Sequence, residues 1–289
     1  MNFFNRNSIK TYTSILFFAY NTITQATEEY TLFNPTPANA MRAMATERPS
    51  KTDSPYSVDA GHIQIETNLL GYSKNDDCNQ GICTKTRQYE VGSFNNIRIG
   101  LTNRTDLQIV TDLYLNKTDE FSNSPRKERN QGTSDTQLRL KYNVFGNNPS
   151  DQYALGLLPY IKFATHRENL GNNKIEYGLG VPFNINFADD WSLGGMTVLS
   201  AINDEQHEGY DFAYANSLVV GKAINAKLRT YLEYYSYKAR QPGERFKNTV
   251  DFGLIYTINP NFSADINVQK GVSDAADDLK FLVGSVYRF

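Results

Sequence analysis

The stretch "IEYGLGVPFNINF", residues 175–187, alternates between two kinds of side chain. Its odd-numbered positions are all apolar, and its even-numbered positions are mostly glycine or polar residues. A period of two residues is that of a β-strand, so the stretch predicts a strand with one wholly apolar face. Its 13 residues exceed the ~5 to 6 residues of an average soluble strand and suffice for the ~9 to 11 with which a tilted strand crosses a bilayer.

The same unit, an alternating run followed by a break rich in Asn, Asp, Gly or Pro, recurs from residue 61 to the end of the chain. Twelve such runs are found, at residues 61–72, 86–101, 105–117, 135–145, 151–164, 175–187, 191–202, 209–222, 226–238, 245–258, 261–271 and 278–289. We therefore predict an all-β fold with twelve antiparallel strands.

The breaks alternate in length. Those at residues 102–104, 146–150, 189–190 and 259–260 are short, whereas those at residues 74–85, 118–134 and 166–174 are long. Short turns at one rim and longer loops at the other, on an even number of strands, are typical of a transmembrane β-barrel of the bacterial outer membrane, with short periplasmic turns and longer extracellular loops. The predicted barrel spans residues 61–289.

Alternation by itself also fits a soluble sheet with one buried face. The membrane interpretation rests in addition on aromatic residues that lie on the apolar face beside short turns, as an interfacial girdle requires. These residues are Phe145, Tyr153, Phe187, Trp191 and Phe262. The net charge of −2 in 289 residues gives no reason to expect a nucleic-acid partner.

The first 26 residues have a different composition from the rest. Arg6 and Lys10 precede the short apolar run 12–20, and small residues follow at 24–26. This order is that of a secretory signal peptide, so we assign residues 1–26 to a signal. In an exported protein Cys78 and Cys83, the only two cysteines, are expected to form a disulfide. The three histidines are far apart in sequence, and we expect no metal site, no cofactor and no catalytic residue.

The chain ends on an apolar strand, "LKFLVGSVYRF". Its last residues, Tyr287 and Phe289, resemble the C-terminal signal by which the barrel-assembly machinery of the outer membrane recognises its substrates. Pairing of this strand with the first would close the barrel and leave no free strand edge, which lipid does not tolerate. We expect a monomer for the same reason.

A second resemblance lies at residues 45–66, "ATERPSKTDSPYSVDAGHIQIE". This stretch resembles the opening motif of a family of Gram-negative outer-membrane β-barrels that is named for the phenol meta-degradation pathway and described as transporters. Glu47 and Ser50 stand where that motif commonly has Asp. The resemblance implies an outer-membrane transporter of small, aromatic or hydrophobic solutes, and it assigns no role to any residue.

Residues 27–60 lie between the signal and the first strand and contain four prolines, which argue against one long helix. As a plug, the segment would pair its charges with the lumen through Arg48, Lys51, Asp53 and Asp59. As a linker, it would hang in the periplasm. We favour partial insertion, because larger barrels carry plugs and the segment is rich in charge and turn residues.

Function is expected on the inward-facing positions of the strands. The predicted lumen residues are Glu66, Glu90, Arg98, Asp112, Arg139, Lys141, Tyr160, Lys162, Glu176, Arg229, Tyr231, Glu233, Tyr235, Lys247, Asp251 and Asp265. Their mixed signs favour paired networks over marked ion selectivity. The tyrosines could line a path for aromatic solutes. Alternatively, all of these side chains could merely fill a narrow barrel.

The sequence thus predicts an outer-membrane channel for passive or gated uptake of small solutes. A surface-structural or adhesion barrel that acts through its loops is the alternative, and the basic run at residues 125–129 could then meet lipopolysaccharide. A lipid hydrolase is disfavoured, because no strand carries a His and a Ser in the spacing that such chemistry requires.

Overall fold

The computed structural model describes residues 30–79, 82–204 and 209–289. The predicted signal peptide, residues 1–26, lies outside this range. In the described part of the chain, no helix is long and apolar enough to cross a membrane.

Fourteen strands account for most of the described residues. They are β1 (Ile63–Asn79), β2 (Ile82–Thr102), β3 (Thr105–Thr111), β4 (Tyr114–Phe121), β5 (Lys127–Gly132), β6 (Thr136–Phe145), β7 (Tyr153–Phe163), β8 (Glu176–Ala188), β9 (Trp191–Asn203), β10 (Tyr210–Ala223), β11 (Leu228–Ala239), β12 (Lys247–Asn259), β13 (Phe262–Gly271) and β14 (Leu279–Arg288).

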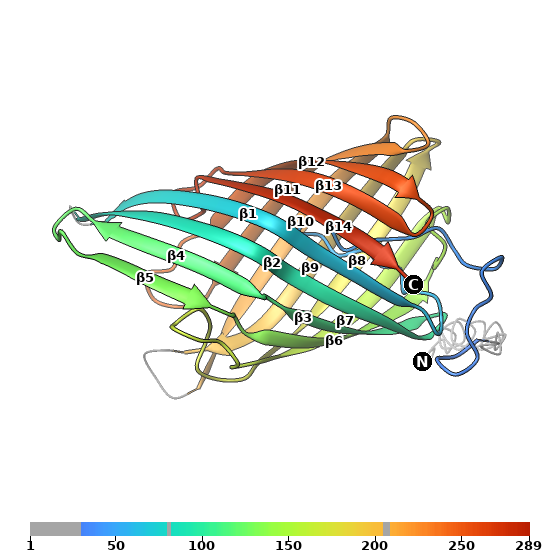
Figure 1. Ribbon diagram of the computed structural model, residues 1–289, viewed down its shortest axis with the longest axis horizontal. Coiled ribbons are helices and arrows are strands. Elements are labelled where there is room, and N and C mark those ends of the chain that lie inside the picture. The colour runs from blue at the N-terminus through green and yellow to red at the C-terminus, as the bar shows by residue number, and fades with distance from the viewer. Residues whose placement is uncertain (1–29, 80–81, 205–208) are drawn as a thin grey trace, which may run out of the picture.

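The strands form one sheet that closes on itself. Each strand from β6 to β14 pairs with the next, β6 pairs with β3, β3 with β2, and β1 pairs with both β2 and β14. All of these pairs are antiparallel, and the ring contains twelve strands. The predicted twelve-stranded barrel is therefore confirmed, with β3 and β4 as successive parts of its third strand and β5 and β6 of its fourth (Figure 1).

The two faces of the ring differ as a membrane barrel requires. Tyr177, Leu199 and Leu232 are 45–56% exposed on the outer face, whereas Arg98 and Lys141 are fully buried inside. A surface of aliphatic and aromatic side chains around a charged interior suits lipid outside and a polar lumen inside.

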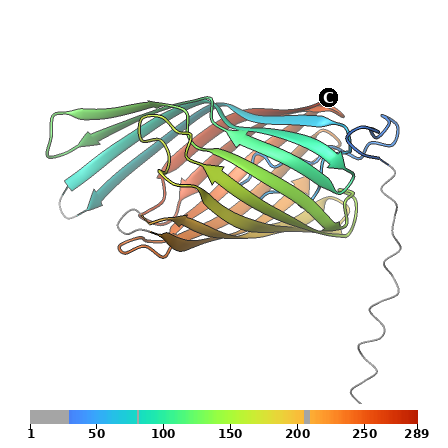
Figure 2. The same ribbon diagram turned by 90° about the horizontal axis from the view of Figure 1, so that it is seen from below.

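The expected long loops at residues 74–85 and 118–134 were largely wrong. Most of these residues belong to β1, β2, β4 and β5, which form two hairpins that extend past the rest of the ring (Figures 1 and 2). The polar residues of these stretches predict loops. In the structure they form strands, because ion pairs between neighbouring strands take the place of apolar contacts. Arg87 lies 2.6 Å from Asp76, and Lys127 lies 2.6 Å from Glu120.

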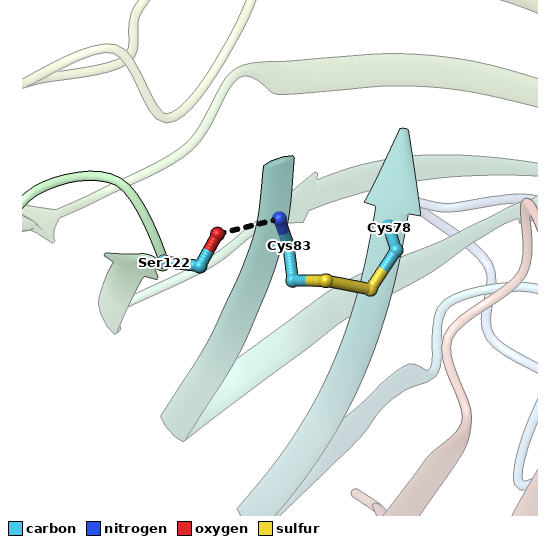
Figure 3. Close-up of a disulfide and its surroundings, with 3 residues drawn as sticks. All are labelled: Cys78, Cys83 and Ser122. Atoms are coloured by element: carbon cyan, nitrogen blue, oxygen red, sulfur yellow. Dashed lines mark hydrogen bonds between the residues drawn. A yellow bond between two sulfur atoms is a disulfide. The ribbon is translucent and has the colours of Figure 1, made fainter. Parts of the chain in front are cut away.

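A disulfide joins Cys78 of β1 to Cys83 of β2 near the tip of the first hairpin (Figure 3). The two residues are direct cross-strand partners with Cα atoms 4.0 Å apart. The Cys83 backbone N–H also donates to Ser122 Oγ at 2.9 Å, which ties this hairpin to the turn that follows β4 (Figure 3).

Replacement of both Cys78 and Cys83 by serine is expected to loosen only the hairpin tip. The bond closes a short loop, so its loss costs at most about 2 kcal/mol of local stability. Amide hydrogen exchange should become faster at residues 75–79 and 82–88 and remain unchanged in β12 and β13, while heat-modifiable gel mobility persists. Faster exchange throughout the ring would contradict this expectation.

The wall is irregular where β2 meets the junction of β3 and β4. Gly92 and Phe94 have φ angles of 60° and 46°, and β1 shifts register between Asn68 and Leu70. The Asp112 carboxylate accepts the Phe94 backbone N–H at 2.6 Å and also the Ser134 hydroxyl. This irregularity directs the Phe94 ring towards Arg139 in the interior, at 5.7 Å.

Candidate functional site: the lumen and the segment inside it

Residues 45–60, the later part of the segment that precedes β1, run inside the ring. Their side chains and backbone bond to residues of β1–β3, β6, β8 and β10–β14. Only a chain within the lumen can reach strands on all sides of a closed barrel. The segment begins at the end of the ring that holds the C-terminus, where Figure 1 shows it in blue.

The most enclosed part of the site is centred on Arg98 of β2. Its guanidinium lies 2.7 Å from Glu47 of the segment, 3.1 Å from Glu66 of β1 and 2.8 Å from Asp106 of β3. Lys141 of β6 makes a second ion pair with Glu47. The side chains of Arg98, Glu47, Glu66, Asp106 and Lys141 that meet here are all 0% exposed.

The neighbouring part of the segment attaches to a second stretch of the wall, formed by β11, β12 and β13. Arg48 pairs with Asp265 of β13 at 2.6 Å, and Lys51 approaches Asp251 of β12 at 3.4 Å. The Glu233 carboxylate of β11 accepts the backbone N–H groups of Lys51 and Thr52, both at 2.8 Å. Glu233 therefore holds the backbone of the segment, and its neighbours hold its side chains.

A third group of contacts lies at the rim. Asp59 accepts from Arg42 at 2.6 Å and from Arg288 of β14 at 3.1 Å. The His62 ring lies 2.7 Å from the Phe289 carbonyl oxygen and 2.8 Å from that of Thr36. The end of the chain is thus bonded to the beginning of the barrel.

The pKa values of the two carboxyl groups of the segment that lie closest to β6 shift in opposite directions. Burial opposes ionisation of Glu47, but Arg98 and Lys141 together lower its pKa to about 2. Burial raises the pKa of Asp53 to about 7, because Arg139, at 3.5 Å, opposes this effect only in part. The surroundings therefore favour the charged form of Glu47 and disfavour that of Asp53.

The predicted lumen residues occupy three kinds of position. Those buried inside the ring are Glu66, Glu90, Arg98, Lys141, Glu176, Tyr231, Glu233, Asp251 and Asp265. Arg139, Tyr160, Lys162 and Tyr235 are partly buried. The other three are Asp112 in the irregular part of the wall, Arg229, which lines the cavity near the short turns, and Lys247, which is exposed at the start of β12.

Sequence reasoning missed two members of the Arg98 cluster. Asp106 shares the parity of the predicted Asp112, so the alternation in β3 could have revealed it. Glu47 was noted only as a departure from a motif. Its partners, Arg98 and Lys141, are 51 and 94 positions further along the sequence, and no local pattern connects them.

Comparison with known proteins places the sequence in a family. Residues 46–289 match the family model described as "Putative MetA-pathway of phenol degradation". The chain belongs to this family. The match begins within the lumen segment and continues to the last residue, so the family includes both the barrel and most of the residues that anchor the segment. No curated protein matches the chain.

Solved structures agree on the architecture. An outer-membrane channel from Pseudomonas putida F1 is similar with a TM-score of 0.57 and 12% identity, over 85% of this chain and all of that one. The transport unit of an autotransporter from Escherichia coli has a TM-score of 0.54 and 12% identity, over 84% of this chain and 92% of that one. The protein is therefore an outer-membrane β-barrel.

Proposed function

We propose that the protein is an outer-membrane channel for small solutes and that residues 45–60 form its plug. One observation carries this proposal: the segment separates two cavities. A cavity of 690 Å³ lies on the side of the short turns, where Asp189 and Trp191 line it, and one of 460 Å³ lies further in. Arg48, Pro49, Ser50 and Asp53 line both. A route along the lumen is thus interrupted at these residues.

We propose small aromatic compounds as the solutes. The family is described by a pathway of phenol degradation, and aromatic rings belong to the inner cavity. Tyr160, Tyr235 and Phe94 line it. Aromatic side chains offer a weakly polar surface that stacks on other rings, which supports passage of such molecules in preference to sugars or inorganic ions.

Deletion of residues 27–60 is the test of this proposal. Single-channel currents of the refolded full mature protein should be absent or rare in planar bilayers, and those of the truncated protein should appear as discrete steps. Removal of the segment leaves the barrel wall intact and takes away the only described chain that crosses its interior. Heat-modifiable gel mobility must be the same for both proteins.

Two other results would be informative. Equal steps from both proteins would contradict the plug and reduce the segment to a linker. If neither protein carried current although both barrels were folded, the channel function itself would be refuted. This result would favour the surface-structural alternative, which rests on the sheet of β1, β2, β4 and β5 that extends past the ring.

We also infer that the barrel is a monomer and that it catalyses no reaction. We further infer that the barrel-assembly machinery recognises Tyr287 and Phe289 when it inserts the protein into the membrane. Both rings lie on the outer face at the end of β14, where Tyr287 is 44% and Phe289 62% exposed. Their centroids are 4.6 Å apart. The part of β1, β2, β4 and β5 that extends past the ring is charged, and it is the surface that lipopolysaccharide would contact.

A further inference from the structure

The inner cavity has one wall that differs from the rest of the lumen. Leu158 of β7, Gly180 of β8, Val198 of β9, Ala215 of β10 and Tyr237 of β11 are successive cross-strand partners. All five line the cavity of 460 Å³. They form a continuous apolar row across five strands of an inner face that is elsewhere rich in charge.

The row is a surface that water wets poorly. Leu158 is 3% exposed and Ala215 is 7% exposed. Met196, which is 6% exposed, lines the same cavity next to the row. On other strands, Phe94 of β2 and Leu282 of β14 also face this space. A cavity of this size, between apolar walls with a few polar groups, is typical of small-molecule sites.

The charged groups of this cavity are mainly cations. Arg48, Lys51, Arg139 and Lys280 line it, and Asp53 is the only carboxylate that does so among the described residues. The other carboxylates that pair with these cations lie behind them. Asp251 and Asp265, the partners of Lys51 and Arg48, are at most 1% exposed, and Glu90, the partner of Lys280, is 2% exposed.

Two of these cations, Lys280 and Arg139, remain accessible. The side chain of Lys280 is 24% exposed and that of Arg139 is 13% exposed. The Lys280 ammonium lies 2.5 Å from Glu90, and Arg139 lies 3.5 Å from Asp53. An ammonium has three N–H donors and a guanidinium has five, so each can accept a further anionic ligand.

Charge and apolar surface are adjacent. Arg139 of β6 is the direct cross-strand partner of Tyr160, which lies two residues beyond Leu158 on the same face of β7. At the other end of the row, the Lys51 ammonium lies over the Tyr235 ring at 4.8 Å from its centroid, and Tyr235 is two residues from Tyr237. A ligand could therefore contact both kinds of surface together.

We propose that this cavity is a binding site for organic anions with an apolar body, of which aromatic carboxylates are the simplest. The ring lies against the row from Leu158 to Ala215, and the carboxylate accepts hydrogen bonds from Arg139 and Lys280. The proposal rests on the proposed channel and specifies its solute class. A neutral aromatic lacks the charge-assisted bonds, and an aromatic amine meets four cations.

Isothermal titration of the refolded full mature protein in detergent tests the site. The probes are benzoate, benzyl alcohol and benzylamine, which share the ring and differ in charge. Benzoate should bind at least about tenfold more tightly than the other two, because hydrogen bonds to charged groups are stronger than those between neutral ones.

Two variants and their matched controls locate the binding. Lys280→Met retains the apolar stem and removes the charge, and Val198→Thr places a hydroxyl in the row at nearly constant shape. Each should weaken benzoate binding about tenfold. Val220→Thr, on the lipid-facing side of β10, and Lys227→Met, in a short turn, should leave the affinity unchanged.

The outcomes separate this site from the channel. Equal affinity for benzoate and benzyl alcohol would overturn the anion preference. No heat of binding from any probe, or equal affinity in all four variants, would overturn the site. Benzoate binding in a protein whose truncated form carries no current would sustain the site and refute the channel. Current through the truncated protein without benzoate binding to the full protein would sustain the channel and refute the site.

Discussion

Arg98→Ala should lower the free energy of unfolding of the barrel by about 3–5 kcal/mol, the usual cost of removing one partner from a buried ion pair. The side chain is fully buried and bonds to carboxylates of three different parts of the chain: Glu47, Glu66 and Asp106. Without it, only the Lys141 ammonium remains beside these groups, and it contacts Glu47 alone.

The substitution should also weaken the attachment of the plug to the wall. Arg98 also donates to the Tyr56 carbonyl oxygen at 2.8 Å, and Asp106 accepts the Val58 backbone N–H at 2.9 Å. The variant should therefore release the segment more readily as well as weaken the wall between β1 and β3. Urea-dependent unfolding in lipid vesicles, followed by fluorescence of the single Trp191, measures the first effect.

The matched control is Arg87→Ala, on the same strand. Arg87 and its partner Asp76 are 30% and 46% exposed, so solvent screens their ion pair. Such pairs contribute about 0–1 kcal/mol. If Arg98→Ala also lowered the free energy of unfolding by no more than about 1 kcal/mol, the buried cluster would not hold the segment to the wall.

Gly100→Ala is expected to displace the segment from β2 at a cost of about 1–3 kcal/mol, the typical cost of overpacking. A Cβ at residue 100 would lie 2.0 Å from the Asp59 carbonyl oxygen and 2.7 Å from its carbon. These are backbone atoms, and they cannot rotate away. Gly61 donates to the Gly100 carbonyl oxygen at 2.9 Å, so a shift also breaks this bond.

Limited trypsin digestion of the folded protein detects the displacement. Cleavage after Lys51, which is held inside the ring, should become faster in Gly100→Ala. Gly180→Ala is the control, because its Cβ would meet nothing closer than 3.5 Å on the same inner surface. Identical digestion of the two variants would show that the close approach of the segment at Gly100 does not position it.

Much of the barrel was predictable because strand alternation is a local property. In β8 every second residue from Tyr177 to Phe187 is apolar, and a closed barrel with lipid outside is the arrangement that buries none of them. The prediction failed where that signal vanished. Residues 74–79 and 127–132 are polar on both faces, and their pairing depends on Arg87, Lys127 and the neighbouring strand.

The contacts of the lumen segment were beyond such reasoning. The residues Arg48, Lys51, Asp53 and Asp59 could be named as charges of a plug, but not their partners. Arg48 pairs with Asp265, which is 217 positions further along the sequence. The two residues are brought together only because β14 pairs with β1 and closes the barrel. The register of every strand between them contributes to that distance.

By itself, the sequence determined the number of strands in the wall, the side of each strand that faces lipid, and the polarity of the interior, because alternation and turn chemistry act over a few residues. Only the tertiary structure decided which buried charges neutralise one another. Glu47 meets Arg98 and Lys141, and Leu158 joins a row with Val198 and Ala215. Those neighbours are set by strand register and ring closure, which are global properties of the fold.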